Sequence, residues 1–400
     1  MLVFQSLRNR NYALYWSADL VASIGSFIKE VALYWVAYEI TGSAFALGIL
    51  GLCDAGPRLI LSMLGGVLVD RYDRLRLMIL MQFMSAVPVF VLFFLYAAGL
   101  LEFWHILVLE IWYAIIRTIS PSVSQSLIRD LATDQELLNA VALSTIGFNF
   151  ARVVGPSLGG VLMLWIGAGG TFILHALTLI ISGVQMMPIR VARKVPAGRE
   201  ANVVREITEG LRYIRHAPVI LCSIGTAYAI SAFVGSYPRF LPIFAKEILD
   251  VGPQGFGILL AAPGLGAVLA LVFLSYAGQE WRRETLMGLA AILAPFFLIL
   301  FCSSRSFVLS VLFLTLLGAG HIAFRTISRV IIQFEVPNDL LGRVMSVFVM
   351  DQGMRSVGSL ILGTAATLLG APLGLSVTSA VCVMLTAFLF YRLRGRSARP

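Results

Sequence analysis

Residues 65–76 read Gly-Gly-Val-Leu-Val-Asp-Arg-Tyr-Asp-Arg-Leu-Arg, and they separate two long apolar runs. Five charged residues fall within this short stretch. An apolar run of about 20 residues is long enough to cross the hydrocarbon core of a bilayer as a helix. The stretch therefore predicts a hairpin of two membrane-spanning helices whose connecting loop carries charge at one membrane face.

The composition of the whole chain agrees with this prediction. Of the 400 residues, 59% are hydrophobic and 13% are charged, whereas soluble domains carry about 25% charged residues. A net charge of +9 would suggest nucleic-acid binding in a soluble protein. Here the basic residues gather in the loops between apolar runs, so membrane topology accounts for them. We expect an all-α polytopic membrane protein that binds no nucleic acid.

Residues with catalytic or metal-binding chemistry form no recognisable set. The four cysteines lie far apart within apolar runs, so neither a disulfide framework nor a metal site is expected. The sequence has no phosphate-binding loop and no nucleophile–base pattern. We therefore expect no enzyme, no cofactor and no direct use of ATP. The first apolar run is too long to be a cleavable signal peptide.

Twelve apolar runs divide the chain into two groups of six. The expected spans are 11–40, 44–69, 76–99, 103–127, 138–164, 169–189, 218–246, 254–278, 285–303, 306–331, 343–369 and 372–391. They predict a six-helix half over 1–189, a linker over 190–217 and a second half over 218–400. Ile207, Leu211 and Ile214 share one face of the linker, which predicts an amphipathic helix on the cytoplasmic surface. The alternative is a disordered linker.

Lys and Arg residues indicate the orientation of the chain. Most of them lie at the two ends and in every second loop, whereas the opposite loops hold Lys246 and Arg305. Because basic loops remain in the cytoplasm, both termini are expected there.

The two halves also resemble each other. Arg117-Thr118-Ile119-Ser120 recurs at residues 325–328. A constant offset of 203 residues pairs Arg152 with Arg355, and Gly155 with Gly358. Internal repeats of this kind are typical of transporters. We expect Arg152 and Arg355 to be symmetry mates, each buried between helices and paired with a carboxylate or with carbonyl groups.

Charged and polar residues inside the spans form stripes at helical spacing. The stripes consist of Asp19, Ser23, Ser26 and Glu30; Glu110, Tyr113, Arg117, Ser120 and Ser124; Tyr228, Ser231, Gly235 and Arg239; and His321, Arg325 and Ser328. A charge at the bilayer centre costs about 2.5–3.5 kcal/mol and needs water or a partner. The stripes predict a water-filled cavity that receives a small-molecule substrate. The alternative is polar packing between helices.

Two carboxylates are the first candidates for proton coupling. Asp19 and Glu110 have no close partner on their own helices, whereas the pairs Asp54–Arg58 and Asp351–Arg355 are spaced to neutralise themselves. Asp54 and Asp351 are therefore the second candidates. Lys29 and Glu30 are expected near the outer rim. His175 is expected to be structural, on a helix that faces lipid.

The opening stretch resembles the signature loop of the major facilitator superfamily, G-x-x-x-D-R-x-G-R-[KR]. Gly66, Asp70, Arg71 and Arg74 match it, while Asp73 replaces a glycine and Leu75 a basic residue. The resemblance implies two pseudo-symmetric six-helix halves with a cavity between them. It also implies a cytoplasmic latch, in which Asp70 contacts Arg74 or the helix start near 342–345. An ordinary positive-inside loop is the alternative.

Residues 151–160 are similar to the antiporter motif of drug–proton exporters, g-x-x-x-G-P-x-x-G-G. The motif contributes Arg152 and the small or kinking residues Gly155, Pro156, Gly159 and Gly160, which we expect to pack against Gly264 and Gly266. Segments 7–12, 209–215 and 341–346 resemble the bacterial branch of enterobactin-exporter-like and macrolide-efflux-like proteins.

That resemblance implies a monomeric exporter in the bacterial inner membrane, surrounded by lipid. It would exchange protons for small amphiphilic molecules such as drugs or siderophores. A lipid or lysolipid translocator and a non-transporting membrane sensor are the alternatives.

Overall fold

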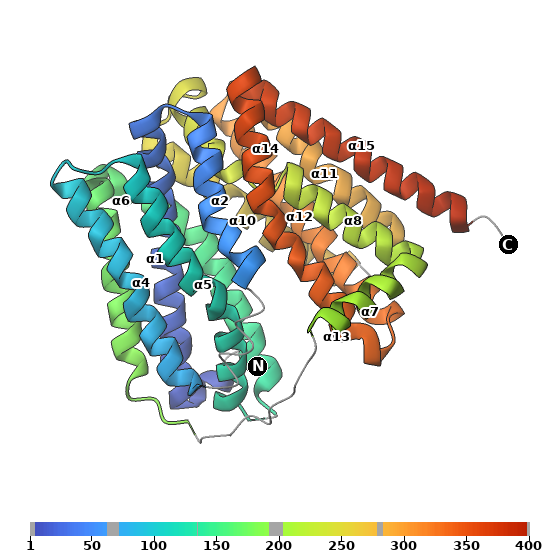
Figure 1. The fold of residues 1–400 in the computed structure, drawn as a ribbon, viewed down its shortest axis with the longest axis horizontal. Coiled ribbons are helices and arrows are strands. Elements are labelled where there is room, and N and C mark those ends of the chain that lie inside the picture. The colour runs from blue at the N-terminus through green and yellow to red at the C-terminus, as the bar shows by residue number, and fades with distance from the viewer. Residues whose placement is uncertain (1–4, 62–71, 134, 192–202, 278–282, 398–400) are drawn as a thin grey trace. The chain divides into compact units, whose positions relative to one another are not determined.

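The computed structural model describes residues 5–61, 72–133, 135–191, 203–277 and 283–397, and within them every regular element is a helix (Figure 1). The chain divides into two compact units. Unit 1 comprises Met1–Gly42, Cys53–Gly198 and Gly252–Ala261. Unit 2 comprises Ser43–Leu52, Arg199–Val251 and Ala262–Pro400. The sequence-based division at 189 and 218 stays a prediction.

Unit 1 is built mainly from four long helices. They are α1 (Arg10–Thr41), α4 (Arg74–Ala97), α5 (Phe103–Leu131) and α6 (Leu137–Met186), and the short η1 (Gln5–Arg8) precedes them. Local residues define their ends: the Asn9 side chain accepts hydrogen bonds from two backbone N–H groups at the start of α1, as an N-cap does. At the other end, Gly42 adopts φ 57°, which suits glycine.

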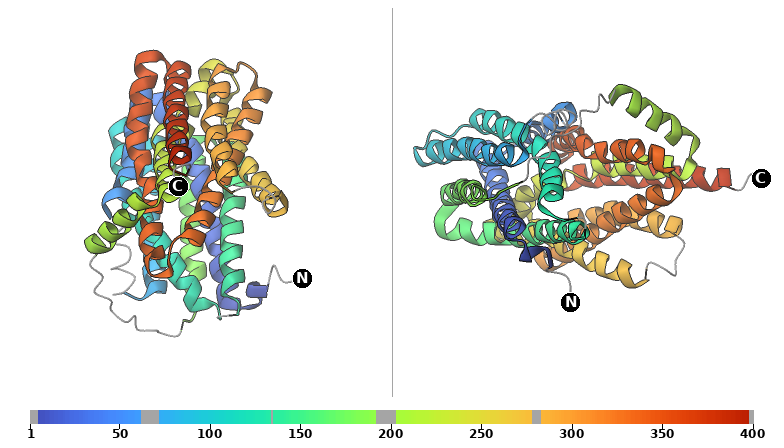
Figure 2. Two further views of the ribbon diagram at one scale, coloured as in Figure 1. Left: turned by 90° about the vertical axis from the view of Figure 1, so that its right-hand side faces the viewer. Right: turned by 90° about the horizontal axis from the view of Figure 1, so that it is seen from below.

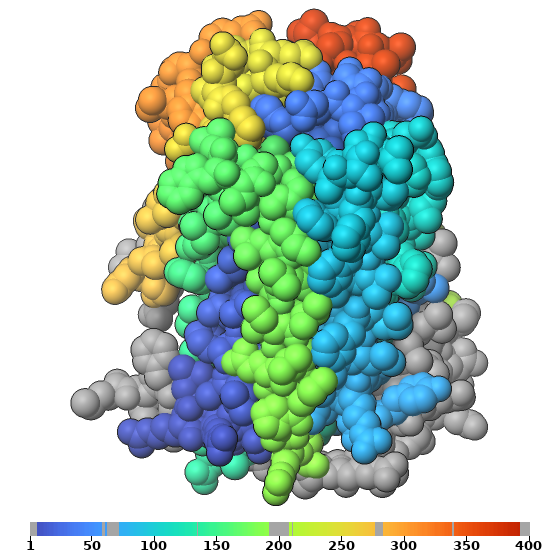
Figure 3. Space-filling view, turned by 90° about the vertical axis from the view of Figure 1, so that its left-hand side faces the viewer, coloured from blue at the N-terminus to red at the C-terminus, as the bar shows by residue number. Residues whose placement is uncertain are grey.

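The helix α6 contains two of the expected spans. Its backbone leaves helical geometry at Gly167, where φ is 69° and ψ is 178°. Glycine tolerates this conformation because it has no Cβ. The second part of α6 lies along α4 on one face of unit 1 (Figure 3). There Gln82 Nε2 donates to Ser182 Oγ at 3.1 Å.

A cluster of buried side chains holds one end of unit 1 together. Tyr12 and Tyr15 of α1 are fully buried in it beside Met78 of α4, Leu127 of α5 and Leu143 of α6. Each of the four long helices thus contributes a large side chain to the cluster. The cluster holds the helices together at the end of the bundle where the polar stripe of α1 begins.

The remaining helices belong to unit 2, except that α2 and α10 each have residues in both units. In chain order they are α2 (Ala44–Leu61), α7 (Val203–His216), α8 (Pro218–Phe233), η2 (Tyr237–Phe240), α9 (Leu241–Ile243), η3 (Phe244–Ile248), α10 (Gly252–Ala277), α11 (Arg283–Ser303), α12 (Phe307–Glu335), α13 (Asn338–Val349), η4 (Met350–Gly353), α14 (Met354–Leu369) and α15 (Ala371–Ser397). The helix α7 lies beside α13 (Figure 2), and Glu209 of α7 forms an ion pair with Arg343 of α13. Its expected position on the membrane surface stays a prediction.

Nine helices in the described part of the chain are long and apolar enough to cross a membrane. One of them is α6, whose two parts each match an expected span. With α2 and the α13–α14 segment, the order agrees with the twelve spans expected from the sequence.

Two spans expected to be continuous helices are interrupted. The span over 218–246 breaks after α8, where Val234 leaves helical geometry and Gly235 and Pro238 follow. The span over 343–369 is interrupted by the 3₁₀ turn η4, which contains Asp351. Apolar length alone predicts neither break, because a discontinuous helix is as apolar as a straight one.

Candidate functional site

The polar stripes of α1 and α5 lie against each other in a fixed antiparallel register. Tyr15 Oη lies 2.6 Å from Ser124 Oγ, and Ser26 Oγ lies 3.3 Å from Tyr113 Oη. Farther along, Lys29 Nζ donates to Glu110 Oε2 at 2.7 Å. In each of these three pairs the two residue numbers add up to 139. The two stripes therefore form one continuous polar seam.

One end of this seam is a closed, buried ion pair. Lys29 is 3% exposed and Glu110 is 4% exposed. Lys29 Nζ also lies 3.9 Å from the centroid of the Tyr113 ring. Lys29 thus finds its partner 81 residues away on another helix, and its expected position near the outer rim stays a prediction.

His175 belongs to the same buried cluster. Its side chain is fully buried, and Nε2 lies 3.1 Å from Tyr113 Oη. The second part of α6 therefore turns this residue toward the seam, although the helix itself was expected to face lipid. Glu30 interacts electrostatically with Glu110 and accepts a 2.6 Å hydrogen bond from Tyr34 of its own helix.

In the middle of the seam, four polar side chains form no hydrogen bond with the described residues. Asp19, Ser23, Arg117 and Ser120 lie between the Tyr15–Ser124 and Ser26–Tyr113 contacts; we call them the quartet. Among the described residues, none forms a hydrogen bond or direct ion pair with these four side chains. Asp19 and Arg117 are both half-buried and interact electrostatically over a longer distance. The quartet thus offers a carboxylate, a guanidinium and two hydroxyls to a ligand or to water.

The acidic residue of α2 contributes to the same electrostatic environment. Asp54 is half-buried and interacts with both Lys29 and Glu110. Its expected partner Arg58 has a side chain outside the described part of the structure.

Unit 2 contains a second buried ion pair. Arg325 of α12 donates to the fully buried Asp351 at 2.5 and 3.3 Å, and Ser231 Oγ of α8 donates to the same carboxylate at 2.7 Å. The sequence paired Asp351 with Arg355 on its own helix. The 3₁₀ turn at Asp351 removes the regular i,i+4 geometry that this pairing requires.

Other polar residues of the expected stripes lie within unit 2. Tyr228 Oη donates to the Val347 carbonyl at 2.9 Å, and Arg239 Nη1 donates to Ser359 Oγ at 3.1 Å. His321 is half-buried, Ser328 is fully buried, and Gly235 lies in the break after α8. The break replaces the single helical face on which the sequence placed Tyr228, Gly235 and Arg239.

The antiporter-like motif forms close helix contacts. A Cβ added to Gly155 would lie 2.6 Å from Phe27 Cβ of α1, and one on Gly160 would lie 2.8 Å from the Pro253 carbonyl of α10. A Cβ added to Gly159 would lie 3.1 Å from Ile28 Cα of α1, and Pro156 is buried beside Gly257. The partner surface on α10 differs from the one expected, because Gly266 packs against Thr315 instead.

The two arginines expected as symmetry mates are both half-buried. The Arg355 carbonyl accepts a 2.7 Å hydrogen bond from Ser236. Arg152 forms no hydrogen bond or ion pair with any described residue. Its expected carboxylate or carbonyl partner is thus not seen.

Part of the signature loop can be placed. Arg74 binds Asp130 at the end of α5 through two contacts, at 2.7 and 2.8 Å. Asp73 accepts the backbone N–H of Arg76 and caps α4, which gives a local role to a residue that departs from the motif. Gly66, Asp70 and Arg71 lie outside the described residues.

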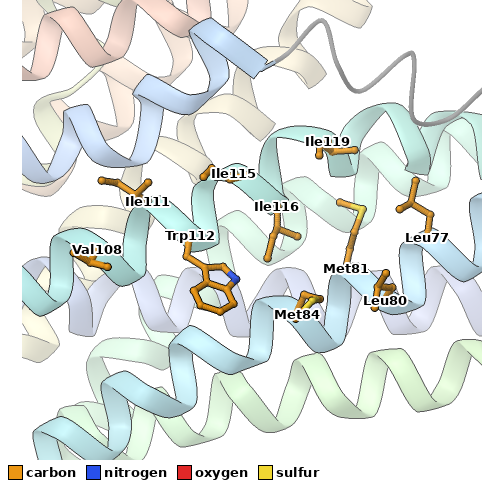
Figure 4. A pocket seen from close by; sticks show the side chains of 10 residues that line it. All are labelled: Leu77, Leu80, Met81, Met84, Val108, Ile111, Trp112, Ile115, Ile116 and Ile119. Carbon is orange, nitrogen blue, oxygen red and sulfur yellow. The ribbon is translucent and has the colours of Figure 1, made fainter.

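An apolar groove of about 500 Å³ runs between α4 and α5 (Figure 4). Met81 and Met84 of α4 face Trp112 and Ile116 of α5 across it. All ten residues that line the groove are apolar, so it can accept a hydrocarbon chain but offers no charge for recognition. In the described part of the chain, no group of three or more His, Cys, Asp or Glu residues could hold a metal ion.

Comparison with known families identifies the fold and the class of protein. A major facilitator family described as "Transmembrane secretion effector" matches residues 2–399. The chain belongs to this family. It is a multi-pass membrane transporter of small molecules with the major facilitator fold, and this family is generally non-enzymatic. The resemblance seen in the sequence is confirmed.

Several relatives support the same conclusion at low identity. The staphyloferrin A transporter of Staphylococcus aureus is 23% identical, with 94% of this chain and 96% of the relative covered. The multidrug efflux pump Tap of Mycolicibacterium fortuitum is 24% identical, with 82% of each covered. The enterobactin exporter EntS of Escherichia coli O1:K1 is 21% identical, with 81% of this chain and 77% of the relative covered.

A solved structure of a bacterial homolog of the human lysosomal transporter Spinster superposes with a TM-score of 0.75. Its sequence identity is 15%, over 96% of this chain and 97% of that one. At this identity the likeness shows the fold alone.

Proposed function

We propose that this protein is a proton-coupled exporter of small amphiphilic molecules, such as drugs or siderophores, which works by alternating access. The observation that carries the proposal is the α1–α5 seam, where a closed Lys29–Glu110 pair adjoins the open quartet. A transporter needs groups that bind and release a ligand, and the quartet has unused hydrogen-bonding capacity among the described residues. Similarity to a multidrug efflux pump and to an enterobactin exporter supports export as the direction of transport.

The two carboxylates of the seam differ in their freedom to change protonation. Glu110 is held by Lys29, and neutralising it would leave a buried ammonium without its partner. Asp19 has no direct partner among the described residues. Water access, or the approach of Arg117, would favour its charged form, while burial would favour its neutral form. Asp19 is therefore the first candidate for the coupling residue, and Glu110 is the second.

Proteoliposomes containing the full-length protein test this function. Transport of Hoechst 33342, ethidium and 1-naphthylacetate is measured with an imposed pH gradient, and exchange is measured without one. We expect Asp19→Asn to lose gradient-driven transport but to keep exchange. If both Asp19→Asn and Glu110→Gln keep gradient-driven transport at the wild-type rate, neither residue couples protons, and Asp54 and Asp351 become the candidates.

The proposal also covers the protein's place in the cell. We propose a monomer in the bacterial inner membrane with both termini in the cytoplasm. The basic loops support the orientation of the termini, and bacterial relatives support the membrane. Cysteine-accessibility labelling at the exposed positions Arg8 and Arg305, on opposite sides in this topology, would test it.

A lipid or lysolipid translocator is the second candidate function. The apolar groove between α4 and α5 favours it, because ten apolar side chains can enclose an acyl chain. Flip of a fluorescent lysolipid in the same proteoliposomes, compared between wild type and Met84→Trp, distinguishes the two functions.

A further inference from the structure

The two sequence repeats pack in the same way, which allows their polar residues to be compared position by position. A Cβ on Gly155 would meet Phe27 and Ile24 of α1, and one on its repeat mate Gly358 would meet Ser231 and Ala232 of α8. Gly160 likewise packs on Gly257, and its mate Gly363 packs on Gly48. The offset of 203 residues therefore corresponds to equivalent helix contacts.

The comparison shows that one repeat lacks a carboxylate that the other has. Arg325 binds Asp351, which also accepts a hydrogen bond from Ser231. The repeat mate of Arg325 is Arg117, in the shared Arg-Thr-Ile-Ser sequence. The offset of 203 places Phe148 at the position of Asp351. Where the second repeat has a carboxylate, the first has the ring of Phe148, whose centroid lies 5.7 Å from that of the Phe27 ring.

Arg117 is consequently an arginine without its carboxylate. It forms no hydrogen bond or direct ion pair with any residue in the described part of the chain. A half-buried guanidinium within a membrane span is costly unless a partner compensates its charge. Its five N–H donors are arranged to bind a carboxylate through two parallel hydrogen bonds. The carboxylate of Asp19 acts on it only over a longer distance.

We propose that Arg117 binds an anionic group, of the carboxylate class, on the transported molecule, and that Phe27 and Phe148 contact its apolar part. The ligand then completes in the first repeat the contact that Asp351 completes in the second. This proposal rests on the proposed function for the statement that the bound molecule is transported. It selects amphiphiles with a negative charge over neutral molecules of the same shape.

A matched pair of probes tests the charge preference. 1-Naphthylacetate and 1-naphthylacetamide share an aromatic body, and only the first carries a carboxylate at pH 7.5. Their dissociation constants are measured by calorimetry with the full-length protein in nanodiscs. Because a charge-assisted hydrogen bond contributes to the binding free energy, we expect Arg117→Gln to bind the acetate about ten- to one-hundred-fold more weakly. Binding of the amide should be unchanged. Arg129→Gln, an exposed arginine on the same helix, is the matched control.

A second variant supplies the missing carboxylate. We expect Phe148→Asp to bind Arg117 internally and to abolish the preference for the acetate, whereas Phe148→Asn removes the ring without adding charge and keeps the preference. Wild-type protein without a preference for the acetate, or Arg117→Gln with the wild-type preference, overturns the proposal. Because binding is measured without a pH gradient, the result is independent of the transport assay. A charge preference without any transport would reject the proposed function and keep Arg117 as an anion site.

Discussion

Lys29 Nζ and Glu110 Oε2 lie 2.7 Å apart, and both side chains are almost completely buried. Breaking a buried ion pair from one side is expensive, because the remaining charge loses its partner. We expect Lys29→Met or Glu110→Leu alone to lower the free energy of unfolding by about 3–5 kcal/mol. The double variant replaces both charges and should recover most of this loss. Thermal unfolding of the wild type, the two single variants and the double variant in one detergent measures the coupling energy between the two side chains. If the double variant loses as much stability as the two single variants together, the ion pair is not coupled.

The small residues of the antiporter-like motif give a second prediction, about packing. A Cβ at Gly160 would lie 2.8 Å from a backbone carbonyl of α10, which cannot rotate away. Overpacking of this kind costs about 1–3 kcal/mol, so we expect Gly160→Val to lower the unfolding temperature and transport. Gly342→Ala is the control, because nothing lies within 4 Å of its added Cβ. Equal stability of the two variants would show that the α6–α10 contact is not tight.

A third prediction concerns the buried carboxylate of unit 2. Asp351 is fixed by Arg325 and Ser231, so its charge is already used inside the protein. We expect Asp351→Asn to destabilise the fold, and Ser231→Ala to cost only about 1–2 kcal/mol because Arg325 remains. Thermal unfolding of each variant tests whether Asp351→Asn loses more stability than Ser231→Ala. A stable Asp351→Asn protein that has lost only gradient-driven transport would instead make Asp351 a coupling residue.

The sequence predicts the number and order of the helices and the polar faces of α1 and α5, because these follow from local apolar length and helical spacing. Asp19, Glu110 and Arg117 were placed on two stripes, and the structure brings the stripes together. The partners were missed. Lys29 binds Glu110, and Asp351 binds Arg325, across helices whose register depends on tertiary packing.

The sequence itself indicates that Arg117 lacks the carboxylate partner that Arg325 has. The repeat offset places Phe148 at the position of Asp351, so the difference between Arg117 and Arg325 could have been found without a structure. The breaks at Gly235 and at Asp351 were not predictable from hydropathy, because it does not report backbone geometry.

The last prediction concerns the loop that follows α2. Arg74 binds both carboxylate oxygens of Asp130, and this contact joins the start of α4 to the end of α5. The side chains are 18% and 9% exposed, so water screens the pair only partly, and we expect Arg74→Ala to cost about 1–3 kcal/mol. If the loop acts as a latch, this variant should also change the rate of exchange in proteoliposomes while probe binding stays at the wild-type value.

Two further variants test whether the effect of Arg74→Ala comes from the loss of its contact with Asp130 or from the loss of a positive charge at this surface. The exchanged pair Arg74→Asp with Asp130→Arg keeps both charges and should recover part of the stability and of the exchange rate. Arg129→Ala removes a neighbouring exposed arginine and should change neither. If Arg74→Ala weakens probe binding and leaves exchange unchanged, the contact supports the binding site and does not belong to a latch.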